Sequence, residues 1–98
     1  MKIKEAQDLI RRIYLDRDRK RGIDRTILRT FEELAELSDA IHRDMPSLDI
    51  ANEVADLFAW VISIANLLDI DLGDVLLSKY NHSCSRCGKV PCECSDTR

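Results

Sequence analysis

Residues 54–68 are the longest apolar stretch of the chain and constrain its fold more than any other segment. At the spacing of an α-helix, the large apolar side chains of this stretch point in every direction around the axis. These side chains are Val54, Leu57, Phe58, Trp60, Val61, Ile62, Ile64, Leu67 and Leu68. The stretch also carries Asp56, Ser63 and Asn66, and it is shorter than the roughly 20 apolar residues of a membrane span. A helix that is apolar on all sides is normally buried, so we expect the central helix of a soluble domain.

Helical periodicity also predicts two elements on the N-terminal side of this segment. Apolar residues three and four positions apart indicate an amphipathic helix over about residues 2–16. The charged run of residues 16–22 has no apolar side chain and ends in glycine, which is typical of a connection between helices. A second helix is expected to begin near Asp24, a suitable capping residue, and to end before Pro46, because proline cannot continue it.

The third helix contains the apolar stretch and is followed by one more short element. Ser47 or Asp49 can cap its start, and it is expected to end near Leu68. A turn at residues 69–71 then leads to a shorter fourth helix over residues 72–80, and no segment shows the alternation of a β-strand. The sequence therefore predicts one all-α domain, a four-helix bundle followed by a short Cys-rich C-terminal tail.

Charge is unevenly distributed along the 98 residues. Residues 31–74 contain eleven acidic side chains and a single basic one, Arg43, whereas residues 1–30 contain ten basic and five acidic side chains. Such an acidic block repels the phosphate backbone of nucleic acids, which argues against a nucleic acid as partner. No apolar signal segment follows Met1, so we expect a cytoplasmic protein without a membrane partner.

Four carboxylates of the second predicted helix share one strip of its surface, opposite the apolar face. They are Glu32, Glu33, Glu36 and Asp39. An acidic strip opposite an apolar face is common on surface helices, so the strip by itself does not indicate a site.

Glu53 and Asp56 are more informative, because they belong to the helix that is predicted to be buried. They are three residues apart and therefore neighbours on its surface. Buried carboxylates are costly unless a cation or hydrogen bonds compensate them, and Arg43 alone is too little for the acids nearby. A bound Mg²⁺ or Mn²⁺ ion, which prefers oxygen ligands, explains the pattern. The alternative is that both side chains are exposed and only stabilise the positive end of the helix dipole.

The same acids also form a two-part motif. Residues 32–37 read Glu-Glu-Leu-Ala-Glu-Leu, and residues 53–57 read Glu-Val-Ala-Asp-Leu. With these Glu-Glu-x-x-Glu and Glu-x-x-Asp patterns, the chain resembles the MazG-like family of all-α nucleoside triphosphate pyrophosphohydrolases. Two further stretches agree with that family, residues 21–22 and residues 68–71 with Lys79, so that the resemblance covers about residues 15–80.

The resemblance implies a reaction and a set of residue roles. The reaction is metal-dependent hydrolysis of a nucleoside triphosphate to a nucleoside monophosphate and pyrophosphate. The implied ligands of Mg²⁺ or Mn²⁺ are Glu33, Glu36, Glu53 and Asp56. Glu32 and Glu36 are the implied catalytic residues. Glu32 would act as a base, or it would contact the metal ligands and hold them in position. Lys79 and Arg21 are implied to bind the substrate.

All four cysteines lie within residues 84–94. Cys84, Cys87, Cys92 and Cys94 form a Cys-x-x-Cys-Gly half-site followed by Cys-x-Cys, the spacing of a tetrahedral thiolate site for structural Zn²⁺. Two disulfides or a flexible tail with free thiols are the alternatives, and His82 is close enough to replace one ligand. We therefore divide the chain into an all-α domain, residues 1–82, and a zinc-binding tail, residues 83–98.

Assembly is the last expectation from the sequence. A chain of this length has few partners to cover an apolar third helix, so we expect a homodimer or a higher homo-oligomer. The competing interpretation is a non-catalytic helical dimer, in which the acids form only a surface and the zinc tail serves interaction with a protein or nucleic acid.

Overall fold

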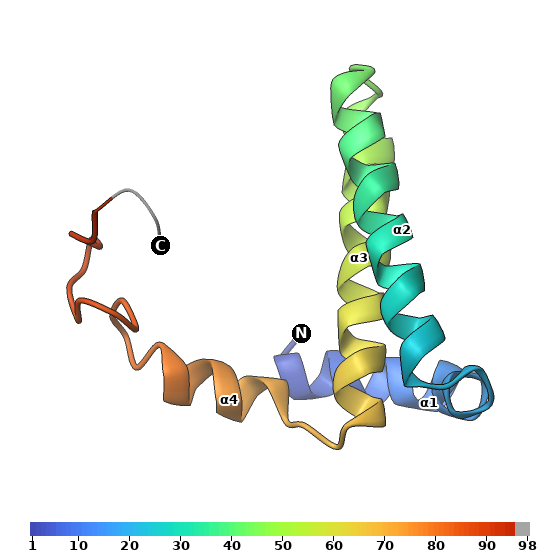
Figure 1. Cartoon of the computed structure of the whole chain (residues 1–98), viewed down its shortest axis with the longest axis horizontal. Coiled ribbons are helices and arrows are strands. Elements are labelled where there is room, and N and C mark those ends of the chain that lie inside the picture. The colour runs from blue at the N-terminus through green and yellow to red at the C-terminus, as the bar shows by residue number, and fades with distance from the viewer. Residues whose placement is uncertain (96–98) are drawn as a thin grey trace.

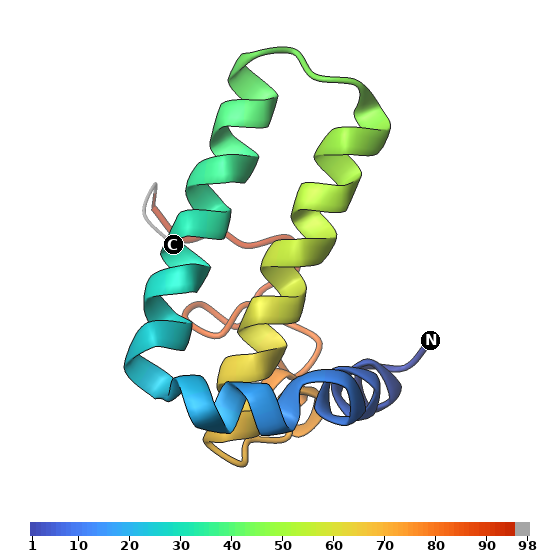
Figure 2. The same ribbon diagram turned by 90° about the vertical axis from the view of Figure 1, so that its right-hand side faces the viewer.

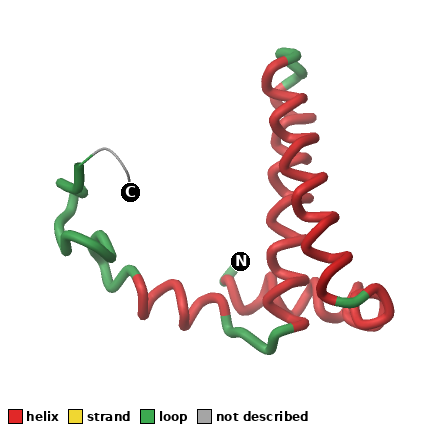
Figure 3. Tube along the Cα trace, in the orientation of Figure 1, coloured by secondary structure: helices red, strands yellow, loops and turns green. Residues whose placement is uncertain are grey.

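The computed structural model describes residues 1–95, which form four α-helices. The helices are α1 (Ile3–Arg21), α2 (Ile23–His42), α3 (Ser47–Leu67) and α4 (Leu72–Lys79). No strand is present in this part of the chain, as the colours of Figure 3 show, so the predicted all-α class is confirmed. None of these four helices is both long enough and apolar enough to cross a membrane.

The longest packed unit is the antiparallel pair of α2 and α3, which residues 43–46 join at one end (Figures 1 and 2). α1 crosses the opposite end of this pair and packs against both helices, more extensively against α3. α4 contacts α1 and leads the chain away from the pair toward the Cys-rich segment (Figure 1). Most of the α2–α3 pair therefore projects from a base that α1 and α4 form.

The connection expected at residues 16–22 is wrong, because α1 continues to Arg21 and only Gly22 separates it from α2. Three basic residues occupy the last turn of α1, where positive charge stabilises a helix. Asp18 is only 2% exposed, and its Oδ1 lies 2.7 Å from Arg21 Nη1, so the charged run is not simply solvated. Gly22 ends the helix with a φ of 86°, which favours glycine, and its N–H donates to the carbonyl oxygen of Asp18.

A buried polar network anchors α1 to the end of α3 and to the start of α4. The side-chain amide of Gln7, 5% exposed, donates to Asn66 Oδ1 at 3.3 Å and to the Ile70 carbonyl oxygen at 2.9 Å. Gln7 Oε1 accepts from the backbone N–H of Leu72 at 2.7 Å. The Asn66 amide in turn donates to the Gln7 carbonyl oxygen at 3.3 Å. Because both ends of the Gln7 amide are paired, the network fixes α4 to α1 without leaving a buried polar group unsatisfied.

Few apolar side chains are buried within the described part of the chain. Ile62 and Ala65 are buried, whereas Phe31 is 67% and Phe58 is 48% exposed. A single copy therefore does not bury residues 54–68 on all sides. α3 is covered where it faces α1 and α2, and it is open elsewhere.

Candidate metal centre and active site

Three carboxylates from two helices meet where α2 packs against α3. They are Glu33 of α2 and Glu53 and Asp56 of α3, and an oxygen of each lies within 4.8 Å of the others. Glu53 and Asp56 are neighbours because residues three apart share one helix face, and the packing of α2 on α3 places Glu33 opposite them. The structure therefore brings together three of the four predicted Mg²⁺ ligands.

These three acids are not simply a solvated patch. Glu33 is 7% exposed and Glu53 is half-buried, whereas Asp56 is exposed. Oε2 of Glu33 and Oε2 of Glu53 are both shielded from solvent and have no hydrogen-bond partner within residues 1–95. A buried carboxylate oxygen without a partner is costly, and a bound cation removes that cost. The two oxygens therefore argue against the alternative in which Glu53 and Asp56 only stabilise the start of α3.

Burial raises the pKa of Glu33 above its ordinary value of 4.5, and neighbouring acids raise it further. After burial, the causes are the charge of Glu36, a hydrogen bond with the Glu36 carboxyl group and the charge of Asp56, while the charge of Arg29 acts in the opposite direction. The carboxylates therefore repel one another more than Arg29 compensates. A divalent cation would reverse this balance, and carboxylate oxygens are the ligands that Mg²⁺ and Mn²⁺ prefer.

Arg29 supplies positive charge that the sequence analysis did not assign to the site. Its Nη2 lies 3.4 Å from Glu33 Oε1, and its Nη1 pairs with Glu32 Oε2. The signal was the spacing of three and four residues between Arg29 and these acids, which places ion pairs on one helix face. Arg43, the basic residue of the acidic block, instead pairs with Asp39 at 3.2 Å on the exposed surface. Arg29 thus engages Glu33 Oε1 and leaves Oε2 for another partner.

A cavity of about 130 Å³ is lined in part by Asp56, one of the three carboxylates. Its lining includes Tyr14, Asp18, Arg21, Asp56, Trp60 and Ser63. Because Asp56 belongs to both the cavity and the carboxylate group, a molecule in the cavity would lie next to a cation held there. The guanidinium of Arg21 lies over the Trp60 ring, 4.7 Å from its centroid, and that of Arg29 lies over the same ring at 5.4 Å. The predicted substrate residue Arg21 therefore lines the same cavity as Asp56.

The other predicted site residues occupy less central positions. Glu36 is exposed and acts on Glu33, but it is not one of the three grouped carboxylates. Glu32 is exposed and paired with Arg29. Lys79 lies at the end of α4, where it borders an apolar groove with Phe58, and none of the acidic residues lines that groove. The structure thus does not bring Lys79 to the carboxylates within one copy.

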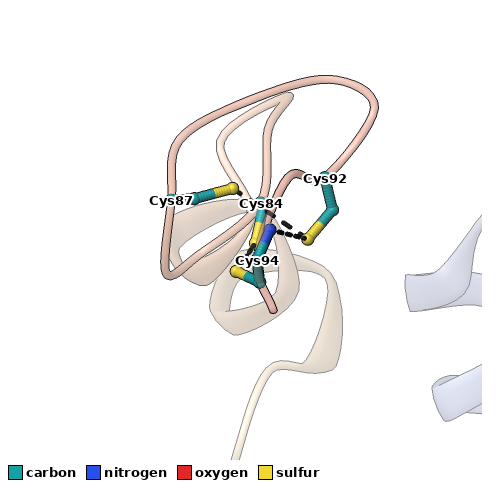
Figure 4. Close-up of side chains that lie close together, drawn as sticks. All are labelled: Cys84, Cys87, Cys92 and Cys94. Atoms are coloured by element: carbon teal, nitrogen blue, oxygen red, sulfur yellow. Dashed lines mark hydrogen bonds between the residues drawn. The ribbon is translucent and has the colours of Figure 1, made fainter. Parts of the chain in front are cut away.

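The four cysteines form a second cluster in the segment after α4 (Figure 4). The Sγ atoms of Cys84, Cys87, Cys92 and Cys94 all lie within 4.8 Å of one another, close enough for one metal ion. Backbone N–H groups of Cys87 and Arg86 lower the pKa of the Cys84 thiol to about 6. Hydrogen bonds with the other thiols, that of Cys92 first, raise the pKa of Cys94 to about 12. Backbone hydrogen bonds from Glu93 and Lys89 also lower the pKa of Cys87. The cluster therefore favours thiolates at Cys84 and Cys87 but resists negative charge at Cys94 unless a cation is present.

Comparison with known proteins adds a family to this geometry. The sequence model of the MazG nucleotide pyrophosphohydrolase domain matches residues 21–90. The matched range is more than half of the chain and includes Glu33, Glu53 and Asp56. A search of curated proteins gives no match. The chain belongs to the MazG nucleotide pyrophosphohydrolase family, whose domain here carries the acids of α2 and α3.

Proposed function

We propose that the chain hydrolyses nucleoside triphosphates between the α and β phosphates and releases a nucleoside monophosphate and pyrophosphate. The observation that carries this proposal is the pair of buried, unpartnered oxygens of Glu33 and Glu53 in a group of three carboxylates. Membership of the family supports the reaction class. The proposed ion is Mg²⁺ or Mn²⁺, and the thiol cluster takes no part in the reaction.

The proposed mechanism assigns a task to each acid. When bound, the divalent ion would neutralise phosphate charge and help to align the attacking water. Glu33, Glu53 and Asp56 would hold the ion, and Glu36, which interacts with Glu33, would complete the ligand set. Glu32 is the proposed base that accepts the proton of the water, and its ion pair with Arg29 orients its carboxylate.

Arg21 is the proposed contact for the substrate. It lies in the cavity that Asp56 also lines, so its positive charge is available to a nucleotide whose phosphates reach the metal. Asp18 holds the guanidinium by an ion pair of 2.7 Å, and the Trp60 ring supports it from one face. Such a pre-oriented cation binds phosphate oxygens at a lower entropic cost than a flexible surface lysine.

Glu53→Gln tests the proposal, because it preserves the volume of the side chain and removes one anionic ligand. Asp39→Asn is the matched control, since Asp39 is an exposed acid of α2 that pairs with Arg43 away from the site. Ribo- and deoxyribonucleoside triphosphates are incubated with each variant and Mg²⁺, and the products are separated by ion-exchange chromatography. We expect the wild type and the control to release pyrophosphate. Glu53→Gln should lose more than roughly 100-fold in rate, the upper loss typical of residues that only support metal ligands.

Two results would reject this proposal. Orthophosphate as the direct product would exclude the reaction class. Wild-type turnover by Glu53→Gln would exclude the carboxylate group as the metal site.

We also propose that the active form is a homodimer or a larger homo-oligomer. Large apolar side chains on α2 and α3 are about half exposed or more: Leu28, Phe31, Leu34, Val54 and Phe58. Apolar surface of this extent favours association, and a two-fold arrangement of identical copies is the commonest way to cover it.

A further inference from the structure

The spacing of the four thiols matches a specific coordination geometry. Cys84 Sγ lies 3.7 Å from Cys94 Sγ, and Cys87 Sγ lies 3.9 Å from Cys92 Sγ. Zn–S bonds of about 2.3 Å in a regular tetrahedron place neighbouring sulfurs about 3.8 Å apart. All four side chains converge on one region, as Figure 4 shows. The two measured separations therefore fit a tetrahedral thiolate site, and every other pair of sulfurs lies within 4.8 Å.

Backbone hydrogen bonds also prepare the sulfurs for a metal. The N–H groups of Arg86 and Glu93 donate to Cys84 Sγ and Cys87 Sγ, each at 3.4 Å. The N–H of Cys94 donates to Cys92 Sγ at 3.3 Å. Donors of this kind stabilise thiolates, and the thiolate is the form that binds zinc.

The turn between the two halves of the cluster requires glycine. Gly88 has a φ of +72°, and its N–H donates to the Cys84 carbonyl oxygen at 2.9 Å. The Cys84 N–H donates to the Lys89 carbonyl oxygen at 3.2 Å. A Cβ at Gly88 would meet no atom within 4 Å, so backbone conformation and not space selects glycine here. This local turn brings Cys87 back toward Cys84.

The alternatives to a metal explain these observations less well. A disulfide requires sulfurs about 2.05 Å apart, far closer than the nearest pairs here, and all four cysteines are free thiols. A metal-free tail would have to hold this compact shape by packing, yet no residue of 81–95 is buried. Without a core, surface hydrogen bonds and the exposed ion pair of Lys89 with Glu93 contribute little against the entropy of ordering the segment, whereas a bound ion contributes much more.

We infer that Cys84, Cys87, Cys92 and Cys94 bind one structural Zn²⁺ ion, and that residues 84–94 take this fold only when the ion is bound. Because protein sulfurs fill all four positions, no position is open for a catalytic water. Soft thiolates select zinc, whereas the hard carboxylates of α2 and α3 select Mg²⁺ or Mn²⁺. The inference is therefore independent of the proposed pyrophosphohydrolase activity.

Metal analysis of the full chain under reducing conditions tests the inference. Purified protein is supplied with Zn²⁺, passed through a desalting column and measured for zinc by mass spectrometry, and a parallel sample receives Co²⁺ for absorption spectra. We expect one zinc per chain and the visible and thiolate charge-transfer bands of tetrahedral Co²⁺. Cys87→Ser and Cys94→Ser should lose the zinc and the bands. His82→Ala, an exposed neighbour of the cluster, and Glu53→Gln should keep them.

Each opposite result overturns the inference. A zinc-free protein lighter by the mass of four hydrogens would show two disulfides. Four thiols that still react fully with an alkylating agent in excess zinc would show that no site forms. Loss of zinc in His82→Ala would show a different ligand set. NMR spectra of the backbone amides complete the test. Chelation of the zinc should shift the resonances of residues 84–94 and leave those of α2 and α3 in place. Unchanged resonances of residues 84–94 would refute metal-dependent folding.

Discussion

Replacing Glu33 by glutamine should stabilise the metal-free protein although it removes a proposed metal ligand. Glu33 is 7% exposed and lies within 4.8 Å of the carboxylates of Glu53 and Asp56. In the unfolded chain these charges separate, so their repulsion weakens only the folded state. Glutamine removes that repulsion and nearly keeps the shape of the side chain.

The size of the effect follows from the geometry. At 4.8 Å, two unit charges repel by about 3.5 kcal/mol at an effective dielectric constant of about 20, and by about 0.9 kcal/mol at about 80. Asp56 is exposed, so its repulsion with Glu33 should lie near the lower of these two values. Loss of the ion pair between Glu33 and Arg29 costs about 0–1 kcal/mol. We expect a net gain of about 1–2 kcal/mol in the free energy of unfolding. For a domain of this size, the melting temperature should rise by at least about 4 °C.

The effect should depend on pH and on metal. Folding raises the pKa of Glu33 above its ordinary value of 4.5, so protonation of Glu33 stabilises the folded state. This stabilisation is complete below pH 4.5 and is lost as the pH rises through the pKa of the folded state. Calorimetry in a chelator at one protein concentration should therefore show similar melting temperatures near pH 4 and a more stable variant at pH 8. Added Mg²⁺ should reverse the order, because it stabilises mainly the wild type. A variant less stable than the wild type at pH 8 in chelator would refute the reasoning.

Three further predictions concern the metal, the assembly and the polar network. Mg²⁺ at a hundredfold excess over its dissociation constant should stabilise the wild type by about 2.7 kcal/mol, and Asp56→Asn should abolish most of the calorimetric shift; an undiminished shift would place the ion elsewhere. Phe58→Glu should give monomers in light scattering, because it adds charge to the exposed apolar face. An unchanged oligomer would remove that face from the interface. Gln7→Ala should cost about 2–3 kcal/mol in urea unfolding, because the Leu72 N–H and the Ile70 carbonyl oxygen lose their hydrogen bonds to the Gln7 side chain. A loss below about 0.5 kcal/mol would show that water replaces the network.

The helix boundaries show which signals a sequence carries by itself. α3 runs from Ser47 to Leu67, close to the expected bounds, because Pro46 and the apolar periodicity are local signals. The expected cap is wrong, since Pro46 occupies the capping position and neither Ser47 nor Asp49 does. The end of α1 was mispredicted because it depends on contacts with other parts of the fold. Asp18 is buried against the rest of the fold, and the pattern of charges in residues 16–22 gives no sign of this burial.

The grouping of three acids was predictable from the sequence, but their environment was not. Spacing on a helix placed Glu53 and Asp56 together, and the resemblance added Glu33. The burial of Glu33 Oε2 and the contact of Arg29 depend on how closely α2 approaches α3, which periodicity does not determine. The open faces of α3 follow from the same limit, since an apolar pattern does not say whether the same chain or another copy covers it.

The two guanidinium groups over Trp60 give the protein an intrinsic optical probe. Trp60 is the only tryptophan of the chain, so the whole indole emission comes from one ring, over which Arg21 and Arg29 both lie. Arg29 also touches a proposed metal ligand, and Arg21 lines the cavity proposed for the nucleotide. If the proposed metal and nucleotide bind there, we expect each to change the surroundings of the ring and so its emission, which would report binding without a label.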